Sequence, residues 1–153
     1  MTPPTDKNFL ERLDPCGLNC GKCFAFQQGD IARHSRELIR SLGNFDVYAQ
    51  RFETLLKEPL FAQYPVFKTF LHFLAQGSCG GCRKEKCKIF KGCGVRACSE
   101  EKRVDFCFQC AEFPCRKTGF DEHLYKRHVQ INRRMKEAGV NQYALETKDQ
   151  SRY

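Results

Sequence analysis

The chain has 153 residues, of which 41% are hydrophobic and 29% are charged, a composition typical of a single soluble domain. No apolar run is long enough to span a membrane, and the first residues lack the basic start and apolar stretch of a secretory signal peptide. We therefore expect a cytoplasmic protein whose thiols stay reduced. The features that need explaining are the eleven cysteines and the formal net charge of +8.

The order of residue types divides the chain into a lead-in and one domain, residues 14–153. The polar residues 1–13 are predicted to be flexible. The domain has four predicted parts, which are a first cysteine loop, a helical segment, a cysteine-rich metal lobe and a C-terminal helix, at 14–23, 24–78, 79–119 and 120–153. Strand patterns are weak throughout, so we expect a mainly α fold with a metal-stapled lobe and short β-hairpins at most.

Residues 24–78 carry the signals of three helices. Asp30 and Asp46 are suited to cap the first two, and Pro65 suits the first turn of the third. Apolar residues recur at helical spacing within each helix. The predicted ends are Gly43, Pro59 and Gly77. The phenylalanines at this spacing are predicted to form a buried core: Phe61, Phe67, Phe70 and Phe73.

The C-terminal segment is predicted to be one long helix followed by a short turn of helix. Asp121 is suited to cap it, and Gly139 to end it. Asn141 is a suitable start for the last turn. His128 lies on the apolar face of the long helix, which predicts a core residue rather than a metal ligand.

Metal coordination explains the cysteines better than disulfides do. Eleven is an odd number, so a complete set of disulfides would leave one thiol unpaired. Three pairs have the spacing C-x2-C, whose tight turn aims both sulfur atoms at one tetrahedral site. Ten cysteines in short spacings are the predicted metal ligands: Cys16, Cys20, Cys23, Cys79, Cys82, Cys93, Cys98, Cys107, Cys110 and Cys115.

Zinc sites take four ligands, so ten cysteines supply about two zinc ions. Two C-x2-C pairs form the expected first site: Cys79, Cys82, Cys107 and Cys110. The first cysteine loop then needs a fourth ligand, which Cys98 or Cys115 is suited to provide. A cross-braced arrangement through Cys93 and Cys98 also fits the spacings.

The cysteine motifs resemble those of a known family. They read Cys16-Gly-Leu-Asn-Cys20-Gly-Lys-Cys23, Cys79-Gly-Gly-Cys82, Cys93-Gly-Val-Arg-Ala-Cys98 and Cys107-Phe-Gln-Cys110-Ala-Glu-Phe-Pro-Cys115. In this order they resemble a family of small cysteine-rich prokaryotic proteins that is described only as a domain of unknown function. The resemblance runs from Cys16 to about Tyr143 and implies a metal-binding protein with no established activity. Cys87 has no counterpart in that pattern and is left out of the predicted ligands.

Zinc is the predicted metal, because scattered C-x2-C pairs are typical of zinc knuckles and the cysteine run of ferredoxins is absent. Cysteine-only ligation also suits iron–sulfur clusters, so an iron–sulfur electron-transfer protein or a redox or metal sensor is the alternative. Radical enzymes that use S-adenosylmethionine share the spacing C-x3-C-x2-C of residues 16–23, but the α/β barrel they need is not predicted. No catalytic motif is found, and no catalytic residue is assigned. An enzyme or sensor with an open three-cysteine site remains a third hypothesis.

The positive charge lies in the second half of the chain. Residues 1–78 hold nine Lys/Arg against eight Asp/Glu, whereas residues 79–153 hold 17 against 10. Two zinc ions with four thiolates each would lower the net charge from +8 to +4. We expect at most weak, sequence-independent binding to nucleic acid, and a protein as the main partner of a binding or adaptor module.

Overall fold

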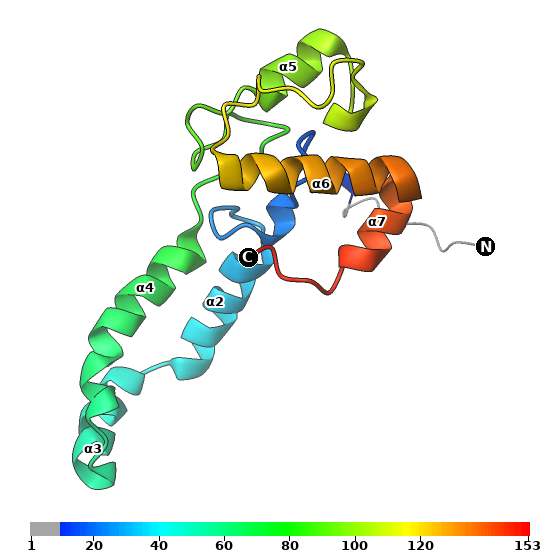
Figure 1. Cartoon of the computed structure of the whole chain (residues 1–153). Helices are drawn as coiled ribbons and strands as arrows, with labels where there is room; N and C mark the ends of the chain where they lie inside the picture. The colour runs from blue at the N-terminus through cyan, green and yellow to red at the C-terminus, as the bar shows by residue number, and fades with distance from the viewer. Residues whose placement is uncertain (1–9) are drawn as a thin grey trace.

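A computed structural model describes residues 10–153, and Figure 1 shows them as a helical body from which a long arm projects. Residues 1–9 of the predicted flexible lead-in lie outside the described residues, and Leu13, at its end, is buried in the body. The helices, in chain order, are η1 (Cys20–Lys22), α2 (Asp30–Leu42), α3 (Phe45–Leu56), η2 (Pro59–Gln63), α4 (Tyr64–Gln76), α5 (Val95–Lys102), η3 (Cys107–Gln109), α6 (Glu122–Ala138) and α7 (Val140–Thr147).

Within residues 10–153, β structure is limited to two isolated bridges, Leu13 to Asn19 and Phe26 to Cys79. The predicted mainly α fold with little or no β structure is therefore confirmed. The described part of the metal lobe contains no hairpin and instead contains α5, a helix that the sequence did not predict. No helix in the described part has the length and apolar character needed to span a membrane.

Two of the predicted helix boundaries illustrate how local sequence sets them. Asp121 caps α6 as predicted, because its carboxylate accepts a hydrogen bond from the backbone N–H of Leu124 at 2.9 Å. Gly77 ends α4 as predicted, with φ of +56°, a conformation that strains other residues. A side chain there would also meet the backbone of Gln27, since a Cβ would lie 2.7 Å from its Cα.

The predicted caps of α2 and α3 are wrong. Gly29 and Asn44 occupy the N-cap positions, and Asp30 and Asp46 lie inside the first turns. A carboxylate in the first turn still stabilises a helix through the helix dipole. Asp46 also holds α4, because its Oδ2 lies 2.6 Å from Lys68 Nζ.

We call residues 30–76 the arm. Its helices α2 and α4 lie side by side, with α3 and η2 at the tip. The buried residues of α4 are Leu71 and Ala75, and the Arg36 side chain of α2 donates a hydrogen bond to the Ala75 carbonyl at 2.8 Å. The tip is an aromatic cluster in which the ring centroids of Phe45 and Tyr64 are 5.0 Å apart.

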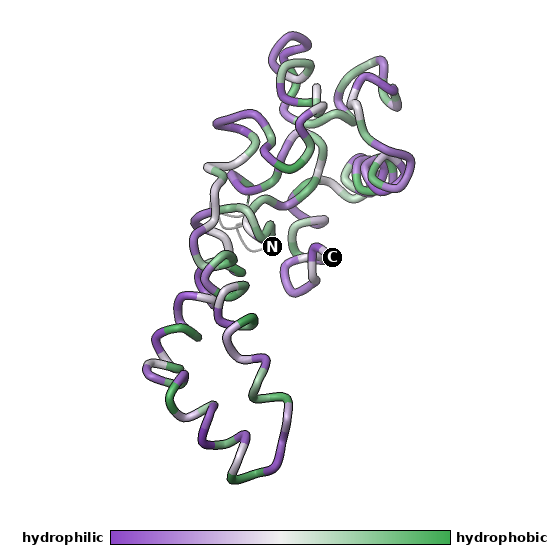
Figure 2. Tube along the Cα trace, turned by 90° about the vertical axis from the view of Figure 1, so that its left-hand side faces the viewer, coloured by the Kyte–Doolittle hydropathy of each residue, from purple (hydrophilic) through white to green (hydrophobic). Residues whose placement is uncertain are grey.

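The predicted phenylalanine core of the arm is wrong for three of its four members. Phe67, Phe70 and Phe73 are 46%, 60% and 56% exposed. Because α4 packs mainly against α2, it buries one stripe of its surface and leaves the other apolar stripe uncovered. Figure 2 shows hydrophobic positions recurring along the arm to its tip.

The body is built on α6. Leu18 and Cys16 of the first cysteine loop pack with Leu124, while Leu13 packs with Met135 further along the same helix. Gly17 permits this approach, because a Cβ on it would lie 2.4 Å from the Ile131 side chain. The first cysteine loop is therefore set directly on the C-terminal helix.

Candidate metal centres

Two buried polar residues of α6 hold the first cysteine loop in place. The Asn132 amide donates a hydrogen bond to the Cys16 carbonyl at 2.7 Å, and His128 Nδ1 lies 3.0 Å from the same oxygen. Asn132 also accepts a hydrogen bond from the backbone N–H of Phe108, in η3, at 3.0 Å. One asparagine thus joins two cysteine motifs that are about ninety residues apart in the sequence.

The end of the chain closes over the same loop. The Lys22 ammonium donates to the Thr147 carbonyl at 2.8 Å, and the Arg152 guanidinium donates to the Asn19 carbonyl at 2.7 Å. The Tyr153 hydroxyl accepts a hydrogen bond from the backbone N–H of Phe24 at 3.1 Å. These contacts fix both sides of the loop that carries the first C-x2-C pair.

The first two C-x2-C pairs lie together, and we call Cys20, Cys23, Cys79 and Cys82 the paired knuckles. The backbone of Cys79 bridges to Phe26 and accepts a hydrogen bond from Gln27 at 3.0 Å, which places residues 79–82 beside the first loop. Cys23 and Cys79 are buried in one apolar cluster. The backbone N–H of Gly81 donates to Cys79 Sγ at 3.4 Å, a contact that suits a metal-bound thiolate.

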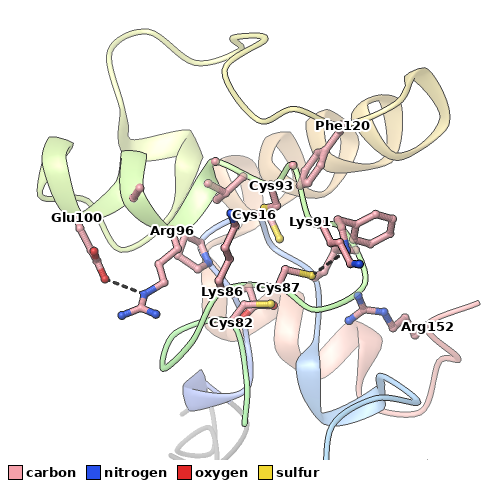
Figure 3. Close-up of a pocket in the computed structure, with 18 residues that line it drawn as sticks. Cys16, Cys82, Lys86, Cys87, Lys91, Cys93, Arg96, Glu100, Phe120 and Arg152 are labelled. Carbon is pink, nitrogen blue, oxygen red and sulfur yellow. Dashed lines mark hydrogen bonds and ion pairs between the residues drawn. The ribbon is translucent and has the colours of Figure 1, made fainter. Parts of the chain in front are cut away.

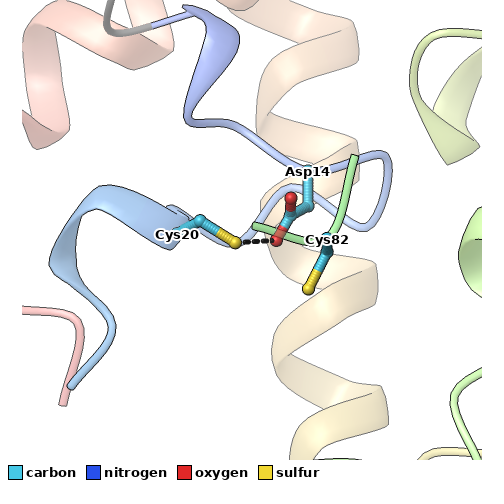
Figure 4. A group of neighbouring side chains, drawn as sticks. All are labelled: Asp14, Cys20 and Cys82. Carbon is cyan, nitrogen blue, oxygen red and sulfur yellow. Dashed lines mark hydrogen bonds between the residues drawn. The ribbon is translucent and has the colours of Figure 1, made fainter. Parts of the chain in front are cut away.

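Figure 4 shows Asp14, Cys20 and Cys82, whose ligand atoms lie within 4.8 Å of one another. Cys20 Sγ donates to Asp14 Oδ2 at 2.8 Å. Burial raises the pKa of Asp14 to about 8, and the hydrogen bond from the Cys82 thiol lowers the pKa of Cys20 to about 6. In the part of the chain that the structure describes, this is the one group of three such ligand atoms so close together, and it is a candidate cation site.

The last four cysteines in the chain form a second set, the outer cysteine group: Cys98, Cys107, Cys110 and Cys115. They line one cavity of about 30 Å³, close to the volume of one water molecule in the liquid, with His128 in its wall. Burial raises the pKa of Cys107 to about 12, with the neighbouring thiols of Cys115, Cys98 and Cys110 contributing to the rise. Thiolates this close repel one another unless a cation lies between them, so this group also suits a single metal ion.

Ion pairs brace the loop that carries the outer cysteine group. Lys102, at the end of α5, and Lys117 both bind the Glu112 carboxylate, and Lys117 Nζ lies 2.5 Å from Glu112 Oε2. These ammonium groups lower the pKa of Glu112 to about 2. The backbone N–H of Cys107 donates to the Pro15 carbonyl at 2.9 Å, which ties this loop to the first cysteine loop.

A larger cavity of about 530 Å³ lies between the first cysteine loop, the loop at 82–93 and α5 (Figure 3). Cys16, Cys87 and Cys93 line it, and we call them the cavity cysteines. Cys82 of the paired knuckles also lines it. Burial raises the pKa of Cys93, and the backbone N–H of Val95, at the start of α5, opposes this rise. The cavity cysteines therefore form a third group beside the two sets of four.

The predicted grouping of the cysteines is wrong. Each of the ten predicted ligands nevertheless belongs to one of the three groups described above. The pair Cys79/Cys82 lies with Cys20 and not with the pair Cys107/Cys110, which lies with Cys98 and Cys115. Spacing along the chain shows which thiols form a pair but not which pairs meet. Cys87 and Asp14 were missed as candidate site residues.

The four histidines and Phe106 have different surroundings. His128 is 1% exposed and packs as the core residue that the sequence predicts. His34, His72 and His123 are exposed. Phe106 is buried in the core of the body, stacked on Phe108 at 5.9 Å.

Comparisons with known proteins agree with the cysteine motifs. No curated protein and no solved structure was found to match the chain. A family model described as a protein of unknown function, DUF3795, matches residues 12–120, a range that includes all eleven cysteines and excludes α6 and α7. The match spans well over half of the sequence, and the chain belongs to the DUF3795 family.

Proposed function

We propose that the chain is a structural zinc protein with two closed thiolate sites, one in the paired knuckles and one in the outer cysteine group. The observation that supports this most is the division of eight cysteines into two sets of four, each drawn from separate segments. Four sulfur ligands are the usual donor set of structural zinc. The two ions would tie the first cysteine loop to residues 79–82, and α5 to the segment that precedes α6.

Closed sites favour a structural role over catalysis. A catalytic zinc keeps one position for water and usually has histidine or carboxylate ligands with a general base nearby. The outer cysteine group has four thiols of its own, and His128 in the cavity wall is a buried core residue of α6. The reduced thiols that such sites need also support a cytoplasmic location as part of this proposal.

Zinc analysis of the purified chain tests the two sites. We expect about two zinc ions per chain, falling to about one in Cys98→Ser and to about one in Cys23→Ser, because each variant opens one four-ligand site. The matched control is Cys87→Ser, which lies outside both sets of four and should keep about two. Zinc absent from the wild-type chain, or unaffected by both variants, would refute the assignment.

The exposed hydrophobic surface of the arm favours a binding role. Ten large hydrophobic side chains of the arm are exposed: Leu38, Val47, Tyr48, Leu55, Leu56, Leu60, Val66, Phe67, Phe70 and Phe73. Along α4, Val66, Phe70 and Phe73 fall on one stripe, and the helix carries a single formal charge, Lys68. Exposed apolar patches of this kind mark interaction sites, so we propose that α4 binds an apolar face of a protein partner.

A negative charge placed on the exposed stripe of α4 tests the arm. Phe70→Glu is expected to reduce the fluorescence of a bound hydrophobic dye by at least twofold, because it removes the centre of the stripe. Thr69→Glu adds the same charge to the same helix and should leave the fluorescence unchanged. Zinc content should stay at about two in both. Equal effects of the two variants would show that the stripe is not a binding surface.

Nucleic acid is the weaker candidate partner. The basic excess of residues 79–153 is reduced by zinc-bound thiolates, and several of its cations are already paired, among them Lys102, Arg116 and Arg134. The remaining cations support only weak, sequence-independent binding, which salt would abolish.

A further inference from the structure

We propose that the cavity cysteines Cys16, Cys87 and Cys93 hold an iron–sulfur cluster in the cavity beside α5, with one iron left open to a ligand from solvent. This site adds Cys87 to the metal chemistry of the chain. It rests on the proposed function only in that the two sets of four cysteines are taken up by zinc, which leaves these three thiols free for a further centre.

The volume of the cavity distinguishes this site from one that holds a single metal ion. Sulfur atoms bound to one zinc lie about 3.8 Å apart, since each Zn–S bond is about 2.3 Å long. Within residues 10–153, the three cavity cysteines do not come within 4.8 Å of one another as a set. The outer cysteine group is not such a set either, but it surrounds about 30 Å³, whereas the cavity cysteines line about 530 Å³. The larger space fits a group of several metal atoms.

The chemistry of the wall fits a cluster. Thiolates are the ligands of iron–sulfur clusters, and hydrogen bonds to the sulfur atoms help to set the reduction potential of the cluster. The backbone N–H of Phe90 donates to Cys87 Sγ at 3.4 Å. Cys93 directly precedes the N-cap of α5, where helix N–H groups favour negative charge. Leu18, Phe90 and Phe120 contribute apolar surface to the wall.

Four cationic side chains line the same cavity: Lys86, Lys91, Arg96 and Arg152. The Arg96 side chain is paired with Glu100 at 2.9 Å, whereas Lys86 and Lys91 form no ion pair within the described part of the chain. Two unpaired ammonium groups offset the charge of the thiolates and favour an anion as the ligand of the open iron. Three cysteine ligands for a four-iron cluster leave one such position.

Anaerobic reconstitution of the full zinc-loaded chain with ferric iron, sulfide and excess dithiothreitol, which reduces half of the iron, tests the site. We expect absorbance near ~400 nm, with about four iron and four sulfide per chain and zinc unchanged at about two. Cys87→Ala, on a half-exposed loop position, and Cys93→Ala should each lose at least ~90% of the absorbance and iron while keeping zinc and helical signal. Lys88→Ala, next to Cys87, is the matched control and should bind the cluster normally.

The outcomes separate this inference from the zinc assignment. Two zinc ions without a reconstituted cluster, or a cluster that survives in Cys87→Ala, would overturn the inference and leave the zinc sites standing. A cluster in a chain that holds no zinc would refute the zinc sites and leave the inference about the cluster standing. A second readout tests the cations, because the double variant Lys86→Ala/Lys91→Ala should lower the reduction potential at unchanged iron content, since removing positive charge disfavours the reduced cluster. An unchanged potential would place the cluster elsewhere.

Discussion

Removing zinc with a strong chelator is expected to unfold residues 79–119 while the arm keeps its helices. The lobe has little apolar core of its own, since its fully buried hydrophobic residues besides cysteine are Val95 and Phe106. Zinc binding to such segments contributes on the order of 10 kcal/mol to folding, so the lobe has no other source of comparable stability. The arm is held by contacts between α2 and α4 that involve no thiol.

Circular dichroism and hydrogen exchange measure this prediction together. The helical signal should fall in part, exchange should become fast across the lobe and stay slow in α2 and α4, and added zinc should restore both. The same chelator saturated with zinc beforehand is the control and should have no effect. If zinc leaves the protein and neither spectrum nor exchange changes, the sites do not hold the fold together.

Asn132→Leu is expected to lower the free energy of unfolding by about 2–4 kcal/mol. The side chain is fully buried and satisfies two backbone groups, the Cys16 carbonyl and the Phe108 N–H. Leucine has a similar volume but no polar atom, so the Phe108 N–H would lose its partner and the Cys16 carbonyl would keep only His128. Both cysteine motifs would lose part of their support.

Urea denaturation of the zinc-loaded protein provides the measurement for Asn132→Leu. The control is Gln130→Leu, an exposed polar-to-leucine change on the same helix, which should shift stability by no more than ~0.5 kcal/mol. Equal stability of the two variants would mean that the buried asparagine is not a structural link between the cysteine motifs.

Glycine signals and one of the three aspartate caps predicted helix ends correctly, whereas Asp30 and Asp46 do not occupy the cap positions expected of them. Gly43, Gly77 and Gly139 each follow the last residue of a helix, and Asp121 precedes one, because glycine and capping side chains act on the residues beside them. The helix α5 was missed because Val95–Lys102 has one large apolar residue and no helical periodicity. Its packing depends on Cys16 and Leu124, which are distant in the sequence.

Arrangements between distant segments were not predictable in the same way. An apolar stripe on α4 predicts a covered face, but the sequence does not specify whether the cover is the same chain or another molecule. The C-x2-C spacings identify pairs of ligands, while the meeting of Cys20 with Cys82 depends on the backbone contact between residues 25–27 and 78–79. Cys87 was omitted because its role depends on a cavity that no local pattern reveals.

The attachment of the first cysteine loop to α6 has a consequence for biosynthesis. The groups that hold the Cys16 carbonyl, on His128 and Asn132, come 112 and 116 residues after it in the chain. At a synthesis rate of about 5–20 residues per second, the thiols of this loop are made roughly 6–23 seconds before those groups exist. A chain interrupted before α6 would therefore lack both side chains that hold the Cys16 carbonyl, and its first cysteine loop would depend on contacts such as that of the Cys107 N–H with the Pro15 carbonyl. The first cysteine loop therefore reaches its final conformation only after α6 has been synthesised.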